Sequence, residues 1–225
     1  MRRQRFAVGE YYHIYCHSID DLKIFRGRCD YERFISLLFV ANGNLQTPRL
    51  DRTSGFGIIE DLSREKITVG EPIVDIVCFC VMPTHFHLLL CEKGKRRENN
   101  ISAYVHKVLV SHAKYFNRKY ERRGHVFESA FHSRHVDTNR YLVYLSRYIH
   151  KNPKDMAQWK GKEFKYPWST YQDYIIWNRW GRLLERSIVL DQFKNLSECR
   201  AYVEERISEE DEAWLKQDGI DLNPV

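Results

Sequence analysis

Two apolar runs of strand length stand on either side of a two-residue connection. The first run covers residues 73–82 and the second covers residues 85–91. Runs separated by so short a connection predict two antiparallel strands joined as a hairpin. Alternate side chains of a strand point to the same face of its sheet. We therefore expect His85 and His87 to project together, while Phe86 points the other way into a core.

The segments around this hairpin alternate between strand and helix patterns. Residues 11–19 are rich in β-branched and aromatic residues, as is typical of a strand, and residues 127–136 are a weaker strand candidate. Apolar residues recur at helical spacing in residues 31–41, 100–120 and 138–152. The order strand, helix, strand, strand, helix, strand, helix predicts an α+β fold with an antiparallel sheet and helices on one face.

Three residues indicate where helices begin or end. Asp30 is expected to cap the first helix, and Thr138 begins the third. Pro153 is expected to end the third helix, because proline lacks the N–H that a helix interior needs. Residues 42–70 are predicted to hold a loop and a short irregular element.

The charge of the chain favours an anionic partner. The formal net charge is +6 and aromatic residues make up 14% of the 225 residues. Basic groups beside aromatic rings suit nucleic acid, although a solvated surface is the alternative. Because they cluster between the histidine strand and the third helix, nine basic residues are predicted to form a phosphate-binding track: Lys93, Lys95, Arg96, Arg97, Lys107, Lys114, Arg118, Arg122 and Arg123.

The hydropathy of the chain and the surroundings of its cysteines indicate in which cellular compartment we expect the protein. No apolar signal region follows the basic residues 1–5, and no apolar run reaches the ~18 residues of a membrane span. We expect a cytoplasmic protein with reduced thiols and no membrane association. Cys78 and Cys80 could join His85 and His87 in a zinc hydrolase, but their apolar surroundings favour buried free thiols.

A chemical site can be assembled from the histidines and the third helix. His85 and His87 can converge on one divalent metal ion. Tyr148 and Asn152 are four residues apart, so they share one face of the helix. The Asn152 carbonyl oxygen is a possible third ligand for Mg²⁺ or Mn²⁺, and Tyr148 is a possible nucleophile.

Alternatives exist on the same helix. Tyr141 and Tyr144 compete with Tyr148 for the role of nucleophile.

The remaining histidines near this site have other expected roles. His150 is expected to support the site or to face DNA rather than to bind metal. His13 and His17 alternate along the first strand and are interpreted as structural or solvent-facing.

Several segments together resemble the single-tyrosine HUH transposases. Within these the chain is similar to the insertion-sequence-200-like superfamily, and most closely to its REP-associated tyrosine transposase branch. The resemblance spans residues 12–174, and HUH denotes His, a bulky hydrophobic residue and His, here His85-Phe86-His87. The segments that carry it are residues 82–89, 115–120, 124–127, 148–153 and 166–171.

The resemblance implies an RRM-like (ferredoxin-like) fold that nicks and rejoins single-stranded DNA near hairpins. Tyr148 would form a 5′-phosphotyrosine link, His85 and His87 would bind Mg²⁺ or Mn²⁺, and Asn152 would occupy the position of the helix-borne ligand. The resemblance leaves open a monomer or a homodimer. An RRM-like nucleic-acid-binding protein without catalysis is the alternative function.

The chain departs from the family pattern in two places and extends beyond it. Thr84 stands where asparagine is frequent, and Glu128 and Ala130 stand where glutamine and arginine are frequent. The resemblance implies a catalytic domain of residues 1–153. Residues 154–225 are expected to form an aromatic and helical extension on or beside it, with an acidic helix over residues 204–212.

Overall fold

The centre of the protein is a four-stranded antiparallel sheet with the strand order β2-β3-β1-β4. The computed structural model describes residues 5–48, 50, 55–94, 99–205 and 208–217. The expected hairpin is present: Val81 pairs with Phe86, and the Met82 N–H donates to the His85 carbonyl over 2.8 Å. The strands are β1 (Tyr11–His17), β2 (Val74–Val81), β3 (His85–Glu92) and β4 (His132–Val136).

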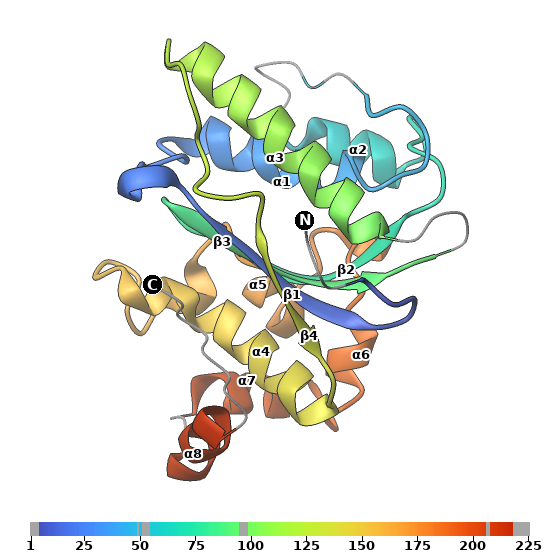
Figure 1. Ribbon diagram of the computed structural model, residues 1–225. Coiled ribbons are helices and arrows are strands. Elements are labelled where there is room, and N and C mark those ends of the chain that lie inside the picture. Colours follow the sequence, from blue (N-terminus) through green and yellow to red (C-terminus); the bar gives the residue numbers. More distant parts are fainter. Residues whose placement is uncertain (1–4, 49, 51–54, 95–98, 206–207, 218–225) are drawn as a thin grey trace.

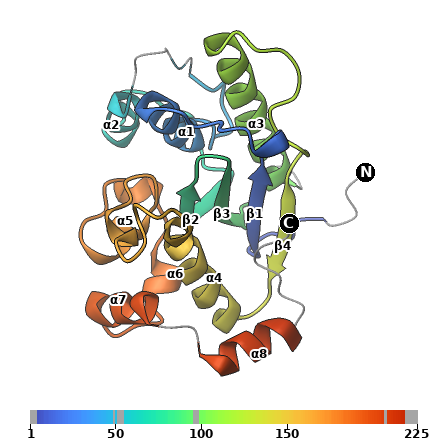
Figure 2. The same ribbon diagram turned by 90° about the vertical axis from the view of Figure 1, so that its left-hand side faces the viewer.

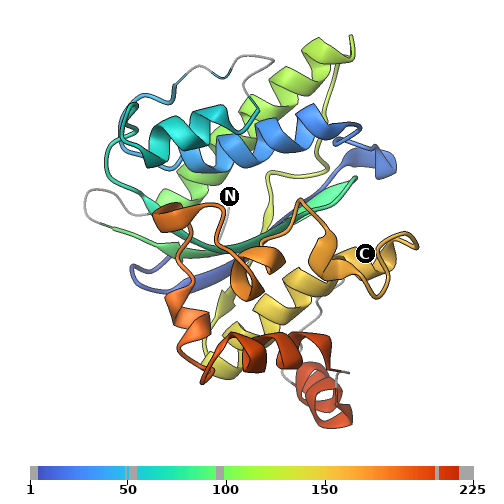
Figure 3. The ribbon, with the colours of Figure 1, turned by 180° about the vertical axis from the view of Figure 1, so that it is seen from behind.

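Helices cover both faces of this sheet (Figures 1 and 2). On one face lie α1 (Arg28–Val40), α2 (Gly57–Ser63) and α3 (Asn100–Lys119), and on the other lies α4 (Asn139–Lys151). The expected α+β, RRM-like fold is confirmed, although the helices are not confined to one face, because α4 packs on the face that carries His85 and His87. α4 and the C-terminal helices add a layer on the second face of the sheet, as the view from behind also shows (Figure 3).

Among the helices of the described ranges, none combines the length and the apolar character that crossing a bilayer requires.

The C-terminal extension consists of short helices. The remaining helices are α5 (Tyr171–Ile175), α6 (Ser187–Leu190), α7 (Leu196–Glu204) and α8 (Glu209–Gln217), and the 3-10 turns are η1 (Ile19–Asp21), η2 (Asn152–Asp155), η3 (Glu163–Lys165) and η4 (Gly181–Leu183).

The extension is hydrogen-bonded to the outer edge of β2. The Val81 N–H donates to the Trp168 carbonyl over 2.9 Å, and the Thr170 N–H donates to the Phe79 carbonyl over 3.0 Å. The Thr170 hydroxyl in turn accepts from the Phe79 N–H over 3.0 Å. These bonds pair the backbone groups of an outer strand that would otherwise be open to another chain.

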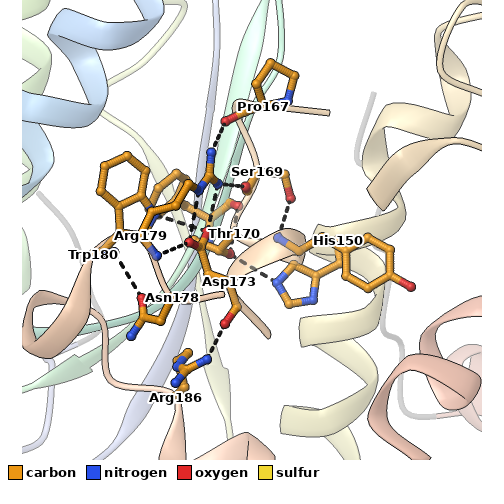
Figure 4. A network of polar contacts seen from close by, with 11 residues as sticks. His150, Pro167, Ser169, Thr170, Asp173, Asn178, Arg179, Trp180 and Arg186 are labelled. Carbon is orange, nitrogen blue, oxygen red and sulfur yellow. Dashed lines mark hydrogen bonds and ion pairs between the residues drawn. The ribbon is translucent and has the colours of Figure 1, made fainter. Parts of the chain in front are cut away.

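A buried carboxylate holds this edge segment in place (Figure 4). Arg179 donates to both oxygens of Asp173, Nε over 3.0 Å and Nη2 over 2.7 Å. The same guanidinium reaches the carbonyls of Pro167 at 2.9 Å and Ser169 at 2.7 Å. Asp173 therefore holds the Arg179 guanidinium in place, and Arg179 in turn fixes the backbone that carries Thr170 against β2.

The cap of the first helix differs from expectation. Asp30 is the third residue of α1 rather than its cap, and its carboxylate accepts from the N–H groups of Arg26 at 2.9 Å and Gly27 at 3.0 Å. Gly27 stands at the cap position without a side chain, so a carboxylate from within the first turn reaches back instead. The Thr138 cap of α4 is confirmed, because its hydroxyl accepts from the Tyr141 N–H over 3.2 Å.

Two other expected elements have different bounds. β4 begins at His132 rather than at residue 127, because Phe127 pairs in an isolated bridge with Ser18 beyond the end of β1. The acidic stretch 204–212 is not one helix: Glu205 has an extended backbone with φ −61° and ψ 156°, which ends α7 before α8 begins.

Candidate active site

The two histidines of the His85-Phe86-His87 string lie on the face of β3 that α4 covers. Their ring centroids are 5.2 Å apart at an interplanar angle of 85°. His87 is 2% exposed and His85 is half-buried. Phe86 points to the opposite face, where it packs on Phe34 of α1. The alternation of a strand thus separates the polar pair from the core residue between them.

α4 brings a tyrosine and an amide to this pair. The Tyr148 ring centroid lies 5.4 Å from that of His87, edge to face at 89°. Oδ1 of Asn152 lies 3.2 Å from Nε2 of His85. Asn152 directly follows α4 and keeps helical backbone angles, φ −51° and ψ −37°, so it stays one turn after Tyr148 on the same face.

The rival tyrosines of α4 point elsewhere. Tyr141 and Tyr144 are 2% and 3% exposed, and their rings lie 6.2 Å and 5.9 Å from the Trp214 ring of α8. Both therefore belong to the contact between α4 and the C-terminal helix. The ring contact with His87 distinguishes Tyr148 from them.

The Nδ1 atoms of His85 and His87 both lie within hydrogen-bond distance of a neighbouring side chain. Nδ1 of His87 lies 2.9 Å from Nε2 of the buried His13, and Nδ1 of His85 lies 3.1 Å from the Thr84 hydroxyl. The Nδ1 contact of His87 leaves its Nε2 as the nitrogen that could bind a metal ion, whereas Nε2 of His85 faces Oδ1 of Asn152. The alternating pattern of β1 was visible in the sequence, but the pairing of His13 with His87 depends on the strand register.

Burial keeps these imidazoles neutral. It lowers the pKa of His85 to about 4, aided by the neighbouring His17, and lowers the pKa of His87 well below its ordinary value. Burial likewise lowers the pKa of His13 to about 3. A neutral imidazole is the form that binds a metal ion, so these rings are in the state that metal binding would require.

Nε2 of His85 and Oδ1 of Asn152 are spaced as two adjacent ligands of a hexacoordinate divalent ion would be, with Asn152 then the third protein ligand. Two ligands at ~2.1 Å from such an ion and at right angles lie about 3.0 Å apart, close to the separation of His85 Nε2 and Asn152 Oδ1. Across the described ranges, no three His, Cys, Asp or Glu side chains lie together so as to hold a metal ion. A metal site built on His85 and His87 therefore depends on the amide oxygen of Asn152.

The zinc alternative finds no support. Cys78 and Cys80 are fully buried in β2, and burial raises the pKa of both thiols. Among the described residues these thiols form no cluster with histidine or carboxylate side chains that could hold a metal ion.

His150 joins α4 to the extension instead of facing DNA. It is 1% exposed, and its Nε2 lies 3.1 Å from the Thr170 hydroxyl (Figure 4). Its ring stacks on Tyr171 at 5.4 Å. Through Thr170 the contact reaches the β2 edge, so it holds the end of α4 that carries Tyr148 and Asn152.

Three of the nine predicted DNA-binding residues share one groove. Lys107, Lys114 and Arg118 line it together with Arg33, which contributes from α1. Arg33 was not predicted, because nothing in the pattern of the first helix distinguishes it from a solvated residue. Most of the residues that line the groove belong to α3, and α3 and α4 lie on opposite faces of the sheet (Figure 2).

The other predicted residues are placed differently. Lys93 forms an ion pair with Asp75 at 2.8 Å. Arg122 and Arg123 follow the end of α3. Residues 95–97, which are Lys95, Arg96 and Arg97, lie outside the described residues. The continuous track remains a prediction.

Comparison with known proteins finds a similarity in fold but none in sequence family. No protein-family model and no curated protein matches the chain. A solved structure of a REP-associated tyrosine transposase bound to a REP hairpin is similar in fold, with a TM-score of 0.53 and 12% sequence identity. The alignment covers 78% of this chain and 84% of that one. At this identity, the similarity shows a shared fold.

Proposed function

We propose that this protein is a DNA-binding transposase that nicks and rejoins single-stranded DNA near hairpins through a covalent tyrosine intermediate. The observation that carries the proposal is the convergence of α4 on β3. Tyr148 lies against His87, and Asn152 lies 3.2 Å from His85. The fold similarity to a transposase bound to a hairpin supports the same class of function.

Tyr148 is the proposed nucleophile. Its phenolic oxygen attacks the phosphorus of the scissile phosphodiester, and the bond from phosphorus to the 3′ oxygen breaks. The tyrosine loses a proton and the departing 3′ oxygen gains one, which leaves a 5′-phosphotyrosine and a free 3′-OH. Attack by a 3′-OH on the phosphotyrosine reverses these changes and restores a phosphodiester. No ATP is consumed, because the tyrosyl ester conserves the bond.

Mg²⁺ or Mn²⁺ is the proposed cofactor, held by His85, His87 and Asn152. When bound, such an ion polarises the phosphodiester and offsets the charge that develops on its oxygens. The chain's own part is to hold neutral imidazoles on one rigid strand and the amide on the helix that also carries Tyr148. Ligands and nucleophile are thereby placed by two elements packed on each other.

The proposed partner is single-stranded DNA that contains a hairpin. The net charge of +6 and the groove lined by Lys107, Lys114 and Arg118 support binding of an anionic polymer. Tyr148 and His87 come from the same chain, so a monomer contains the whole proposed site. A homodimer is compatible with this arrangement but is not required by it.

Covalent trapping tests the proposal. The purified protein is incubated with labelled hairpin DNA from beside its own gene, with Mn²⁺ or with EDTA, and resolved on a denaturing gel. We expect a protein–DNA adduct that depends on Mn²⁺ and is lost in Tyr148→Phe and in His87→Ala. Tyr141→Phe is the matched control, because the Tyr141 hydroxyl is buried without a hydrogen-bond partner among the described residues.

The alternatives give different results in the same assay. An adduct that survives Tyr148→Phe would assign the nucleophile to another tyrosine. Binding of hairpin DNA without any adduct, with several hairpins and both metals, would favour the non-catalytic binding protein.

A further inference from the structure

Three aromatic rings form a row across the sheet beside Tyr148. His87 of β3, Tyr15 of β1 and His132 of β4 occupy neighbouring positions, because Tyr15 pairs with His87 on one side and with His132 on the other. Tyr15 stacks on His87 at 6.0 Å and 27°, and on His132 at 5.0 Å and 15°. We call His87, Tyr15 and His132 the ring row.

The two ends of the ring row have different surroundings. His87 is buried and contacts Tyr148, whereas His132 is exposed. β4 is the outer strand of the sheet, so the face of the His132 ring that does not meet Tyr15 is turned away from the row. A planar aromatic group can extend such a stack at its exposed end.

We propose that His132 is a stacking platform for an unpaired nucleobase of single-stranded DNA. The inference deepens the proposed function, on which it rests: the base would belong to the strand whose phosphate Tyr148 attacks. Stacking on protein rings is the way in which unpaired bases are held without regard to their sequence. The ring row joins this platform to the candidate active site without a break.

Charge near the platform fits the same ligand. Arg134 is two residues further along β4, on the same face, and is half-buried. Its guanidinium carbon lies 5.8 Å from the Tyr141 ring of α4, which places a cation between the ring row and α4. A phosphate next to a base stacked on His132 would be attracted to this charge.

Two variants of one residue and one matched control test the platform. His132→Ala removes the ring, and His132→Phe keeps a planar ring. His135→Ala is the control, because His135 is a histidine of the same strand that faces the other side of the sheet and pairs with Glu10 at 2.8 Å. Thermal melting checks that each variant is folded.

The readout is the dissociation constant of an abasic oligonucleotide divided by that of a thymidine oligonucleotide, both measured by fluorescence anisotropy in EDTA. One ligand is a thymidine oligonucleotide, and the other is an oligonucleotide of the same length and charge made of abasic residues. Phosphate contacts contribute equally to both, so the ratio reports contacts with bases. We expect the wild type to bind the thymidine oligonucleotide more tightly and His132→Ala to reduce the ratio by about 5- to 100-fold. His132→Phe and His135→Ala should keep the ratio.

Several outcomes would overturn the platform. These are an unchanged ratio in His132→Ala, an equal loss in His135→Ala, or a wild type that does not distinguish the two ligands. Because no cleavage is measured, this failure is separate from that of the proposed function. If the wild type forms the covalent adduct but His132→Ala leaves the ratio unchanged, only the platform is rejected. If the wild type forms no adduct but His132→Ala reduces the ratio, the platform is supported on a protein without catalysis.

Discussion

Nε2 of His13 lies 2.9 Å from Nδ1 of His87, in the buried middle of the sheet. Both rings are neutral, since burial lowers the pKa of each. One nitrogen must then donate and the other accept. If His87 donates through Nδ1, its Nε2 carries the lone pair that a metal ion needs. His13 would thus select the tautomer of a proposed metal ligand without touching the metal.

Replacing His13 should weaken metal binding without removing a ligand. We expect His13→Leu to reduce Mn²⁺ affinity by about 10- to 100-fold, because the leucine cannot accept from His87. His13→Gln should retain most of the affinity, because its amide oxygen can accept. Titration calorimetry with Mn²⁺ measures both. Equal affinities in the wild type and His13→Leu would show that the contact does not orient His87.

The Asp30 carboxylate ties α1 to α3 and should make stability depend on pH. Tyr115 and Tyr120 donate to it over 2.9 Å and 2.7 Å, and Lys119 forms an ion pair with it. Burial alone would raise the pKa of Asp30, but the hydrogen bonds from Lys119 and Tyr120 outweigh burial and lower it. The ionised group therefore stabilises the fold above its ordinary pKa of about 4.

Asp30→Ala should lower the free energy of unfolding by ~2–4 kcal/mol at pH 7. The difference from the wild type should shrink as the pH falls from the ordinary pKa of about 4, where the unfolded chain becomes protonated, through the lowered pKa of Asp30 in the folded protein. Urea unfolding at a series of pH values measures this. A penalty of the same size in acid would mean that packing, and not the charge, accounts for the role of Asp30.

Asp173 should be the most costly carboxylate to remove from the C-terminal extension. Arg179 and Trp180 both donate to it, and its side chain is fully buried (Figure 4). We expect Asp173→Ala to destabilise the protein by ~3–5 kcal/mol, because a partly buried guanidinium loses its counter-charge. Asp191→Ala is the control at an exposed position and should change stability by less than about 0.5 kcal/mol. Similar melting temperatures for the two variants would contradict this assignment.

Local patterns in the sequence predicted most of the sheet and its helices. The spacing of residues 100–120 predicted α3 to within one residue of its end, and the short connection at Pro83 and Thr84 predicted the β2–β3 hairpin. These features are set by neighbours within a few residues. The expected cap at Asp30 was wrong for a local reason, because Gly27 takes that position without a side chain.

The parts that could not be predicted depend on contacts between distant segments. His13 and His87 are 74 residues apart and meet only through the register of β1 against β3. The segment around Thr170 reaches the β2 edge through an irregular extension with no periodic pattern. The basic residues near α3 are close to Tyr148 in sequence order, but the sheet separates α3 from α4 (Figure 1).

Peptide mapping of the trapped adduct tests the central claim most directly. Cleavage after Arg147 and Lys151 releases Tyr148 in a four-residue peptide, whereas Tyr141 and Tyr144 leave together in the preceding peptide of residues 141–147. After nuclease treatment of the adduct, mass spectrometry should find the nucleotide remnant on the peptide of residues 148–151. A remnant on residues 141–147, or on any other peptide, would contradict the assignment of Tyr148 as the nucleophile.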